Sequence, residues 1–156
     1  MNFILDTDGV LNDGKFYYSE KGKILKKFGA HDNDGLKILK KFLDIKFITA
    51  DKKGFLISKK RVADMGLKLI YCSEKNRYNY CKKIGFNKII YMGDGIYDYK
   101  ILRDCKFGIS PKNAIKIAKK NSDYVTKREG GDGAIFEACE IIIKKILKKN
   151  IYKLIL

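Results

Sequence analysis

The chain has 156 residues, of which 46% are hydrophobic and 12% aromatic, and its formal net charge is +16. This length and composition indicate one folded domain, residues 1–156, and exclude a disordered chain. No run of about 18 apolar residues is present, which excludes a membrane-spanning helix. An acidic residue at position 6 argues against a signal peptide, so we expect a cytoplasmic location.

The positive charge comes mainly from lysines, which are distributed along the predicted helices and do not form one block. Nucleic-acid-binding surfaces usually combine clustered basic residues with aromatic stacking platforms, and the sequence shows no such arrangement. We therefore expect a partner other than nucleic acid.

Short apolar runs alternate with helical patterns along the chain. The apolar runs predict strands at residues 3–6, 46–50, 68–72, 88–92 and 106–110. The patterns between them predict helices at residues 34–43, 55–65, 77–84, 98–105 and 113–120. Such alternation is typical of a parallel sheet covered by helices on both faces, so we expect an α/β fold with three Rossmann-like layers.

Residues 15–28 break this alternation. Aromatic and apolar residues flank a Ser-Glu-Lys-Gly turn there, which predicts a β-hairpin projecting just after the first strand. The hairpin would form a self-association surface, or a flap folded back on the same domain, through Phe16, Tyr17, Tyr18, Ile24 and Phe28.

The chain ends in a basic amphipathic stretch at residues 140–156, with the sequence EIIIKKILKKNIYKLIL. The spacing of its apolar residues predicts a helix. We expect this helix to pack on the sheet or on another subunit, and a helix resting on an anionic membrane surface is the alternative.

Polar residues follow three of the predicted strands. Asp6 and Asp8 come after the first strand, residues 49–51 end the second, and residues 93–98 follow the fourth. Ligands in α/β folds bind at the carboxyl ends of the parallel strands, so we expect these three clusters to meet at one edge of the sheet.

Four carboxylates, from Asp6, Asp8, Asp94 and Asp98, would then share one pocket. Carboxylates held together repel one another, and a divalent cation relieves that repulsion. Mg²⁺ prefers a few carboxylates and keeps several waters, which leaves room for a phosphate oxygen. The sequence therefore predicts a magnesium site that also receives a phosphate group.

The same residues suit phosphoryl transfer. Asp6 ends the strand, where its carboxylate could attack phosphorus in line, and Asp8 could protonate the leaving oxygen and later activate water. Thr49 could donate its hydroxyl to the phosphoryl oxygens, and a cation from residues 73–79 would neutralise charge in the transition state.

These motifs resemble those of the haloacid dehalogenase (HAD) superfamily of phosphotransferases. The matching residues are Asp6, Asp8 and Gly9 in the first motif, DxDG, Thr49 as the threonine of the second motif, and residues 93–98 in the fourth motif, GDxxxD. An ungapped comparison places Arg77 where the third motif carries its cation, and Lys75 is the alternative.

The resemblance implies an aspartyl-phosphate intermediate on Asp6 and acid–base catalysis by Asp8. It also implies that Mg²⁺ is held by the side chains of Asp6 and Asp94 and by the backbone carbonyl of Asp8. Asp98 would lie next to these ligands without contacting the ion itself. The cofactor that we expect is therefore Mg²⁺.

The likeness narrows to the 3-deoxy-D-manno-octulosonate (KDO) 8-phosphate phosphatases, which residues 6–28 and 123–143 resemble. That subfamily implies a small sugar-phosphate substrate: KDO 8-phosphate or a related eight- or nine-carbon sugar-acid phosphate for surface polysaccharide. It also implies a homotetramer assembled through the hairpins, in which the tail of one subunit approaches the next active site. Arg128 and Gly130 would then reach the pocket of a neighbouring subunit.

Two departures from the subfamily affect the expected substrate. Asp51 stands where the relatives usually carry Arg, and Asp132 replaces an Arg in the glycine-rich turn. Lys52 or Lys53 could restore the lost positive charge, or Asp51 could bind a hydroxyl or amine of a different sugar. The residues predicted to bind substrate are Asp51, Lys52, Arg128 and Gly130.

The spacing of the motifs leaves no room for a cap domain, because the predicted hairpin, helices and strands already occupy the stretches between Asp6, Thr49 and Gly93. Two other functions stay open. A capless phosphatase of nucleic-acid ends would explain the positive charge, and a non-catalytic oligomeric module would retain the site without using it.

Overall fold

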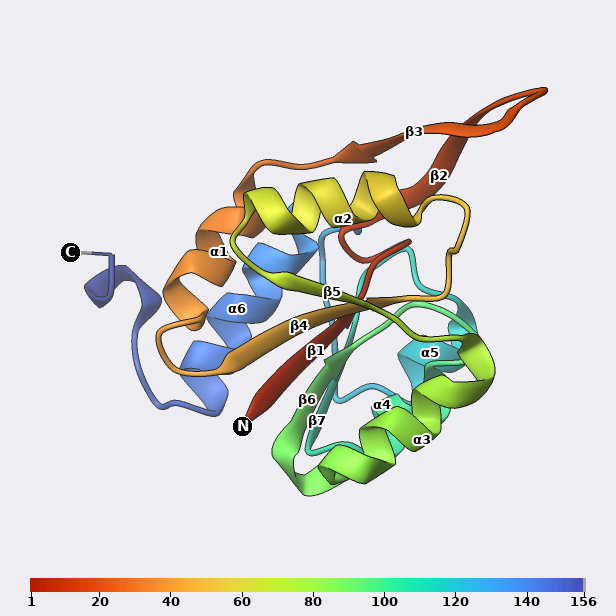
Figure 1. Ribbon diagram of the computed structural model, residues 1–156. Coiled ribbons are helices and arrows are strands. Elements are labelled where there is room, and N and C mark those ends of the chain that lie inside the picture. The colour runs from red at the N-terminus through yellow and green to blue at the C-terminus, as the bar shows by residue number, and fades with distance from the viewer. Residues whose placement is uncertain (156) are drawn as a thin grey trace.

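Six parallel strands form the central sheet, between two layers of helices (Figure 1). The computed structural model describes residues 1–155. The strands lie in the order β5-β4-β1-β6-β7-β8, so the chain starts mid-sheet, builds one half, and then builds the other. In chain order they are β1 (Asn2–Asp6), β4 (Asp44–Thr49), β5 (Lys68–Tyr71), β6 (Ile89–Met92), β7 (Phe107–Ser110) and β8 (Tyr124–Val125).

Three helices cover each face of the sheet. The first face carries α1 (His31–Leu39), α2 (Phe55–Asp64) and α6 (Ala134–Lys145). The second carries α3 (Glu74–Ile84), α4 (Tyr99–Asp104) and α5 (Lys116–Lys120). Two short 3₁₀ turns, η1 (Phe86–Lys88) and η2 (Ile151–Lys153), complete the helical segments. Within residues 1–155 no helix combines the length and apolar character needed to cross a membrane.

The sheet divides the apolar interior into two cores because neighbouring side chains of a strand point to opposite faces. Phe3 and Leu5 of β1 pack against α1, α2 and α6, whereas Ile4 packs against α3, α4 and α5. All three side chains are fully buried. Burial on both faces explains why the central strands read as continuous apolar runs, and it confirms the expected three-layer α/β class.

The expected hairpin is present as β2 (Asn12–Ser19) and β3 (Gly22–Phe28), which pair antiparallel and project from the domain (Figure 1). Its outer part exposes Tyr17, Tyr18 and Leu25. Between β1 and β4 the chain forms only this hairpin and α1, and between β4 and β6 it forms α2, β5, α3 and the turn η1. The expectation that the fold has no cap domain is therefore confirmed.

The five expected strands are confirmed, with ends within two residues of the expected ones. The strand β8 was not anticipated, because two residues are too short for a periodic signal. The helix expected at residues 34–43 lies at 31–39 instead. The helix expected at 113–120 begins only at Lys116, since the preceding residues form a turn in which the Ala114 amide donates to the Pro111 carbonyl.

The expectation of a continuous helix over residues 140–156 is wrong beyond Lys145, where α6 ends. Lys148 adopts a left-handed conformation with φ of 56°, and the chain then turns back. This turn buries Ile151 against the core, and the Tyr152 hydroxyl donates to Glu140 of α6. The tail thus buries part of its apolar surface against its own domain. Leu156 lies outside the described residues.

The glycine-rich turn before α6 packs beneath the loop that follows β1. The Gly131 amide donates to the Val10 carbonyl at 3.2 Å, and the Gly130 amide donates to Oδ1 of Asn113 at 2.7 Å. Asn113 in turn donates to the Gly9 carbonyl at 2.9 Å. This turn therefore supports the loop that carries the first motif of the same chain.

We predict that Gly130→Ala lowers the free energy of unfolding by about 2 kcal/mol or more. A methyl group at this position would lie 2.1 Å from the Gly9 carbonyl oxygen and 2.7 Å from that of Asn12, both of them backbone atoms. Urea unfolding measures the loss. Gly95→Ala is the matched control, because its nearest contact would be 3.4 Å away, and an equal midpoint for the two variants would contradict the prediction.

Candidate active site

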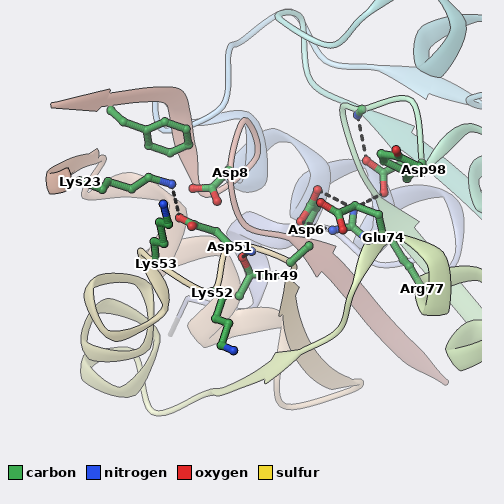
Figure 2. A pocket seen from close by; sticks show the side chains of 14 residues that line it. Asp6, Asp8, Lys23, Thr49, Asp51, Lys52, Lys53, Glu74, Arg77 and Asp98 are labelled. Carbon is green, nitrogen blue, oxygen red and sulfur yellow. Dashed lines mark hydrogen bonds and ion pairs between the residues drawn. The ribbon is translucent and has the colours of Figure 1, made fainter. Parts of the chain in front are cut away.

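The polar clusters that follow β1, β4 and β6 meet at the carboxyl edge of the sheet. The chain leaves β1 toward β4 and leaves β6 toward β7, so this is the point where the direction of the connections changes. Ligands bind at such a point in open α/β sheets. A pocket of about 420 Å³ opens there, and the predicted residues that line it are Asp6, Asp8, Thr49, Asp51, Lys52, Arg77 and Asp98 (Figure 2).

Arg77 provides the cation beside Asp6. Its Nη1 lies 2.7 Å from Oδ2 of Asp6 and its Nη2 lies 3.2 Å from Oδ1, which makes a two-point ion pair. The same Nη1 lies 2.6 Å from Oδ1 of Asp98. Arg77 is buried, whereas Lys75 is exposed to solvent, so of the two cations considered from the sequence Arg77 is the one in the pocket.

Three carboxyl groups, those of Asp6, Asp94 and Asp98, each have an oxygen within 4.8 Å of the others. Burial, reinforced by the charge of Asp98 and outweighing the attraction of Arg77, raises the pKa of Asp6 to about 7. Burial and the charge of Asp6 raise the pKa of Asp94 to about 8. A divalent cation between these groups would compensate both effects, so the donor set fits the expected Mg²⁺.

Asp98 is occupied by protein donors. Its Oδ1 accepts from Arg77 and from the Tyr91 hydroxyl at 2.6 Å, and its Oδ2 accepts from the backbone amides of Asp94 at 3.1 Å and Gly95 at 2.8 Å. It is fully buried. Asp98 therefore holds the loop after β6 in place and pairs with Arg77, beside the Asp6 and Asp94 carboxylates of the same cluster.

Gly9 allows Asp94 to approach the loop that follows β1. Its φ of 81° lies in the left-handed region, and a Cβ at this position would fall 2.0 Å from Oδ2 of Asp94. A side chain at position 9 would strain this backbone conformation and would displace the Asp94 carboxylate from its place beside the loop. The glycine of DxDG thus leaves room for Asp94 in the cluster with Asp6.

The loop after β4 carries Thr49 and Asp51. Thr49 is buried, and its Oγ1 accepts from the Asp51 amide at 3.1 Å. Asp51 pairs with Lys23 at 2.5 Å and with Lys26 at 2.8 Å, both from the hairpin. Burial opposes ionisation of Asp51, but the two lysines outweigh it and lower its pKa to about 2. Asp51 is therefore an ionised group whose charge is matched within the chain.

Lys26 was missed by sequence reasoning. It lies on β3 between exposed residues, yet its side chain is fully buried and its Nζ lies 2.7 Å from Oδ1 of Asp8. No local signal distinguishes it from the other lysines, because a charged residue on a projecting hairpin is expected to face solvent. Only the docking of the hairpin against α2 places it in the site.

The structure does not bring Arg128 and Gly130 to the pocket of their own chain. Gly130 lies beneath the first-motif loop, as described above. Arg128 lines a separate groove of about 940 Å³ beside α6, together with Tyr124, Asp132 and Glu137. The contact of Arg128 and Gly130 with a neighbouring subunit stays a prediction.

Comparison with known proteins shows which family this chain belongs to. A model of haloacid dehalogenase-like hydrolases matches residues 75–138. The 3-deoxy-D-manno-octulosonate 8-phosphate phosphatase of Haemophilus influenzae is 28% identical over 155 residues, which cover 96% of this chain and 86% of that protein. The enzyme of the same name from Escherichia coli K12 is 28% identical over 147 residues, covering 90% and 77% respectively.

A solved structure of this phosphatase from Moraxella catarrhalis, in complex with magnesium ion, phosphate ion and a KDO molecule, matches with a TM-score of 0.80. The sequences are 32% identical, and the match covers 92% of this chain and 85% of that one. The chain belongs to the haloacid dehalogenase-like hydrolases. Within them it is a phosphatase-type hydrolase related to the KDO 8-phosphate phosphatases, which confirms the resemblance seen in the motifs.

We predict that Mg²⁺ binding strengthens as the pH rises from about 6 to about 8.5, by roughly tenfold or more. Protons compete with the cation in this range, because the pKa values of Asp6 and Asp94 are raised to about 7 and about 8. Isothermal titration calorimetry of the metal-free protein at several pH values measures the change. Asp94→Asn should bind Mg²⁺ much more weakly, and a wild-type affinity that is independent of pH would contradict the prediction.

Proposed function

We propose that the chain is a Mg²⁺-dependent phosphatase of KDO 8-phosphate or a related eight- or nine-carbon sugar-acid phosphate. The observation that carries the proposal is the surroundings of Asp6 at the end of β1. Its carboxylate lies 2.7 Å from the Arg77 guanidinium and within the cluster that includes Asp94. A carboxylate nucleophile, a guanidinium and cation-binding acids together suit phosphoryl transfer.

In the first step, an oxygen of Asp6 attacks phosphorus, and the bond from phosphorus to the sugar oxygen breaks. Asp8 gives its proton to that oxygen, so the sugar leaves as an alcohol and Asp6 carries an acyl phosphate. Arg77 and the Thr49 hydroxyl stabilise the charge on the phosphoryl oxygens. Arg77 is buried beside Asp6, which makes its charge more effective than it would be in water.

In the second step, Asp8 takes a proton from a water molecule that attacks phosphorus. The bond between phosphorus and Asp6 breaks, inorganic phosphate leaves, and the Asp6 carboxylate is regenerated. Asp6, Asp94 and the Asp8 carbonyl would hold Mg²⁺. The bound cation supplies positive charge that lets an anionic carboxylate and a phosphate dianion come together.

The part of the pocket beyond Asp8 is proposed to bind the sugar. Lys52 and Lys53 line it, and the charge of Asp51 is matched by the two hairpin lysines. This outer part of the pocket therefore has more lysines than acids despite the loss of the subfamily arginine at position 51, which suits a substrate that carries a carboxylate in addition to its phosphate. The M. catarrhalis phosphatase, whose structure holds KDO, supports this substrate class.

The proposed assembly is a homotetramer built through the hairpins. Tyr17 and Tyr18 are 58% and 62% exposed, and Ile24 and Leu25 of the opposite strand are exposed as well. An apolar surface of this kind on a projecting element favours association with another copy. In such an assembly, the tail region that includes Arg128 would complete the pocket of a neighbour.

We predict that the wild-type protein with Mg²⁺ releases phosphate from one sugar-acid phosphate in a panel. The panel contains KDO 8-phosphate, nine-carbon sugar-acid 9-phosphates, hexose and heptose phosphates, and 3′-phosphorylated oligonucleotides. Asp6→Asn should lower kcat by about a thousandfold or more, because it removes the nucleophile. Preferred hydrolysis of the oligonucleotides would favour the nucleic-acid-end alternative, and a wild type without activity or Mg²⁺ binding would favour a non-catalytic module.

We predict that replacing Tyr17 and Tyr18 together by Asp converts the tetramer to smaller species, because charge at an apolar interface opposes association. Size-exclusion chromatography with light scattering reads the mass directly. Tyr71→Asp is the matched control, since Tyr71 is 50% exposed but lies on β5, outside both the hairpin and the tail. A wild type that elutes with the mass of one chain would overturn the proposed assembly.

A further inference from the structure

The ammonium group of Lys26 makes three short contacts inside the protein. Its Nζ lies 2.7 Å from Oδ1 of Asp8, 2.8 Å from Oδ2 of Asp51 and 2.9 Å from Oγ of Ser58. The ammonium donates hydrogen bonds to Asp8 and Ser58, and it forms an ion pair with the Asp51 carboxylate. The side chain is fully buried, and burying a cation costs free energy unless it is paired and hydrogen-bonded in this way.

Asn12 provides a second donor to the same oxygen of Asp8. Its Nδ2 lies 2.7 Å from Oδ1 of Asp8. The orientation of this amide follows from the backbone, because its Oδ1 accepts from the amides of Gly9 at 3.0 Å and Gly14 at 2.8 Å. The nitrogen must therefore point toward Asp8.

Oδ1 of Asp8 is thus held by two donors, one of them cationic. An oxygen that accepts two such bonds is a poor place for a proton, whereas Oδ2 has no donor among the described residues. We propose that Lys26 is a positioning residue for the acid–base step: it fixes the Asp8 carboxylate so that Oδ2 carries the proton exchanged with the leaving group and with water. The inference rests on the proposed function, because it assigns a role within the same reaction.

The projecting hairpin gains a second role from this contact. Strand β3 contributes Lys26 to the active site of its own chain, and Asp51 and Ser58 anchor the same ammonium to the loop after β4 and to α2. The alternative is a purely structural role, in which Lys26 neutralises Asp51 and ties the hairpin to α2. A positioning role affects only reactions in which the leaving group needs a proton from Asp8, whereas a purely structural role affects all substrates alike.

Lys26→Met tests the inference with two substrates, an alkyl phosphate and p-nitrophenyl phosphate. The alkyl alcohol needs a proton to leave, whereas p-nitrophenolate is a stable anion that leaves without one. We expect kcat/KM to fall by about a hundredfold for the alkyl ester and by less than about fivefold for the nitrophenyl ester. Lys27→Met is the matched control, because Lys27 is the next residue of β3 and is exposed; it should leave both values unchanged.

A double-mutant cycle with Asp8→Asn identifies the residue through which Lys26 acts. If Lys26 works through Asp8, adding Lys26→Met to Asp8→Asn should not lower alkyl-ester hydrolysis further. Lys26→Gln provides a milder change that keeps one donor, and it should show a smaller loss with the same preference for the nitrophenyl ester. Mg²⁺ affinity should be equal in all Lys26 variants and the wild type.

Equal losses for both esters, or additive effects with Asp8→Asn, would overturn the positioning role. An alkyl-ester rate equal to that of Lys27→Met would do the same. A wild type that hydrolyses neither ester would instead overturn the proposed function, and this inference with it, so the two failures are distinguishable.

Discussion

The site depends on one buried guanidinium placed among carboxylates. Arg77 contacts Asp6 and Asp98 at 2.6–2.7 Å, and Asp94 lies within the same cluster. Burial, together with repulsion between the acids, raises the pKa of Asp6 to about 7 and that of Asp94 to about 8 even though Arg77 lowers both, so the guanidinium offsets only part of the cost of placing three acids at this depth. The parallel sheet makes the arrangement possible, because it delivers the ends of β1 and β6 to the same edge.

The hairpin connects this centre to the outer pocket. Buried Lys26 reaches Asp8 and Asp51, and Lys23 also pairs with Asp51, so the hairpin and the loop after β4 form one ionic network. The negative charge at position 51 is therefore balanced by lysines of the chain itself. The same hairpin exposes apolar side chains at its outer end, so one element contributes both to the pocket and to the surface of the proposed assembly.

Features that depend on neighbouring residues in the chain could be predicted from the sequence, whereas features that depend on packing could not. Asp6 and Thr49 were placed correctly at strand ends, because an apolar run followed by polar residues marks the carboxyl edge of a buried strand. The choice between Lys75 and Arg77 required the phase of α3, since residues two apart on a helix point to nearly opposite sides. The burial of Lys26 required the docked position of the hairpin, which no local pattern encodes.

The central claim is that Asp6 is the nucleophile, and trapping the acyl phosphate tests it most directly. The Asp8→Asn variant lacks the proposed base of the second step, so it should accumulate the intermediate when given p-nitrophenyl phosphate and Mg²⁺. After a rapid acid quench, borohydride reduces an acyl phosphate to an alcohol, and peptide mass spectrometry then locates it. The account predicts homoserine at position 6 in substrate-treated samples only. Homoserine at Asp94, or none at any position while nitrophenol is released, would contradict it.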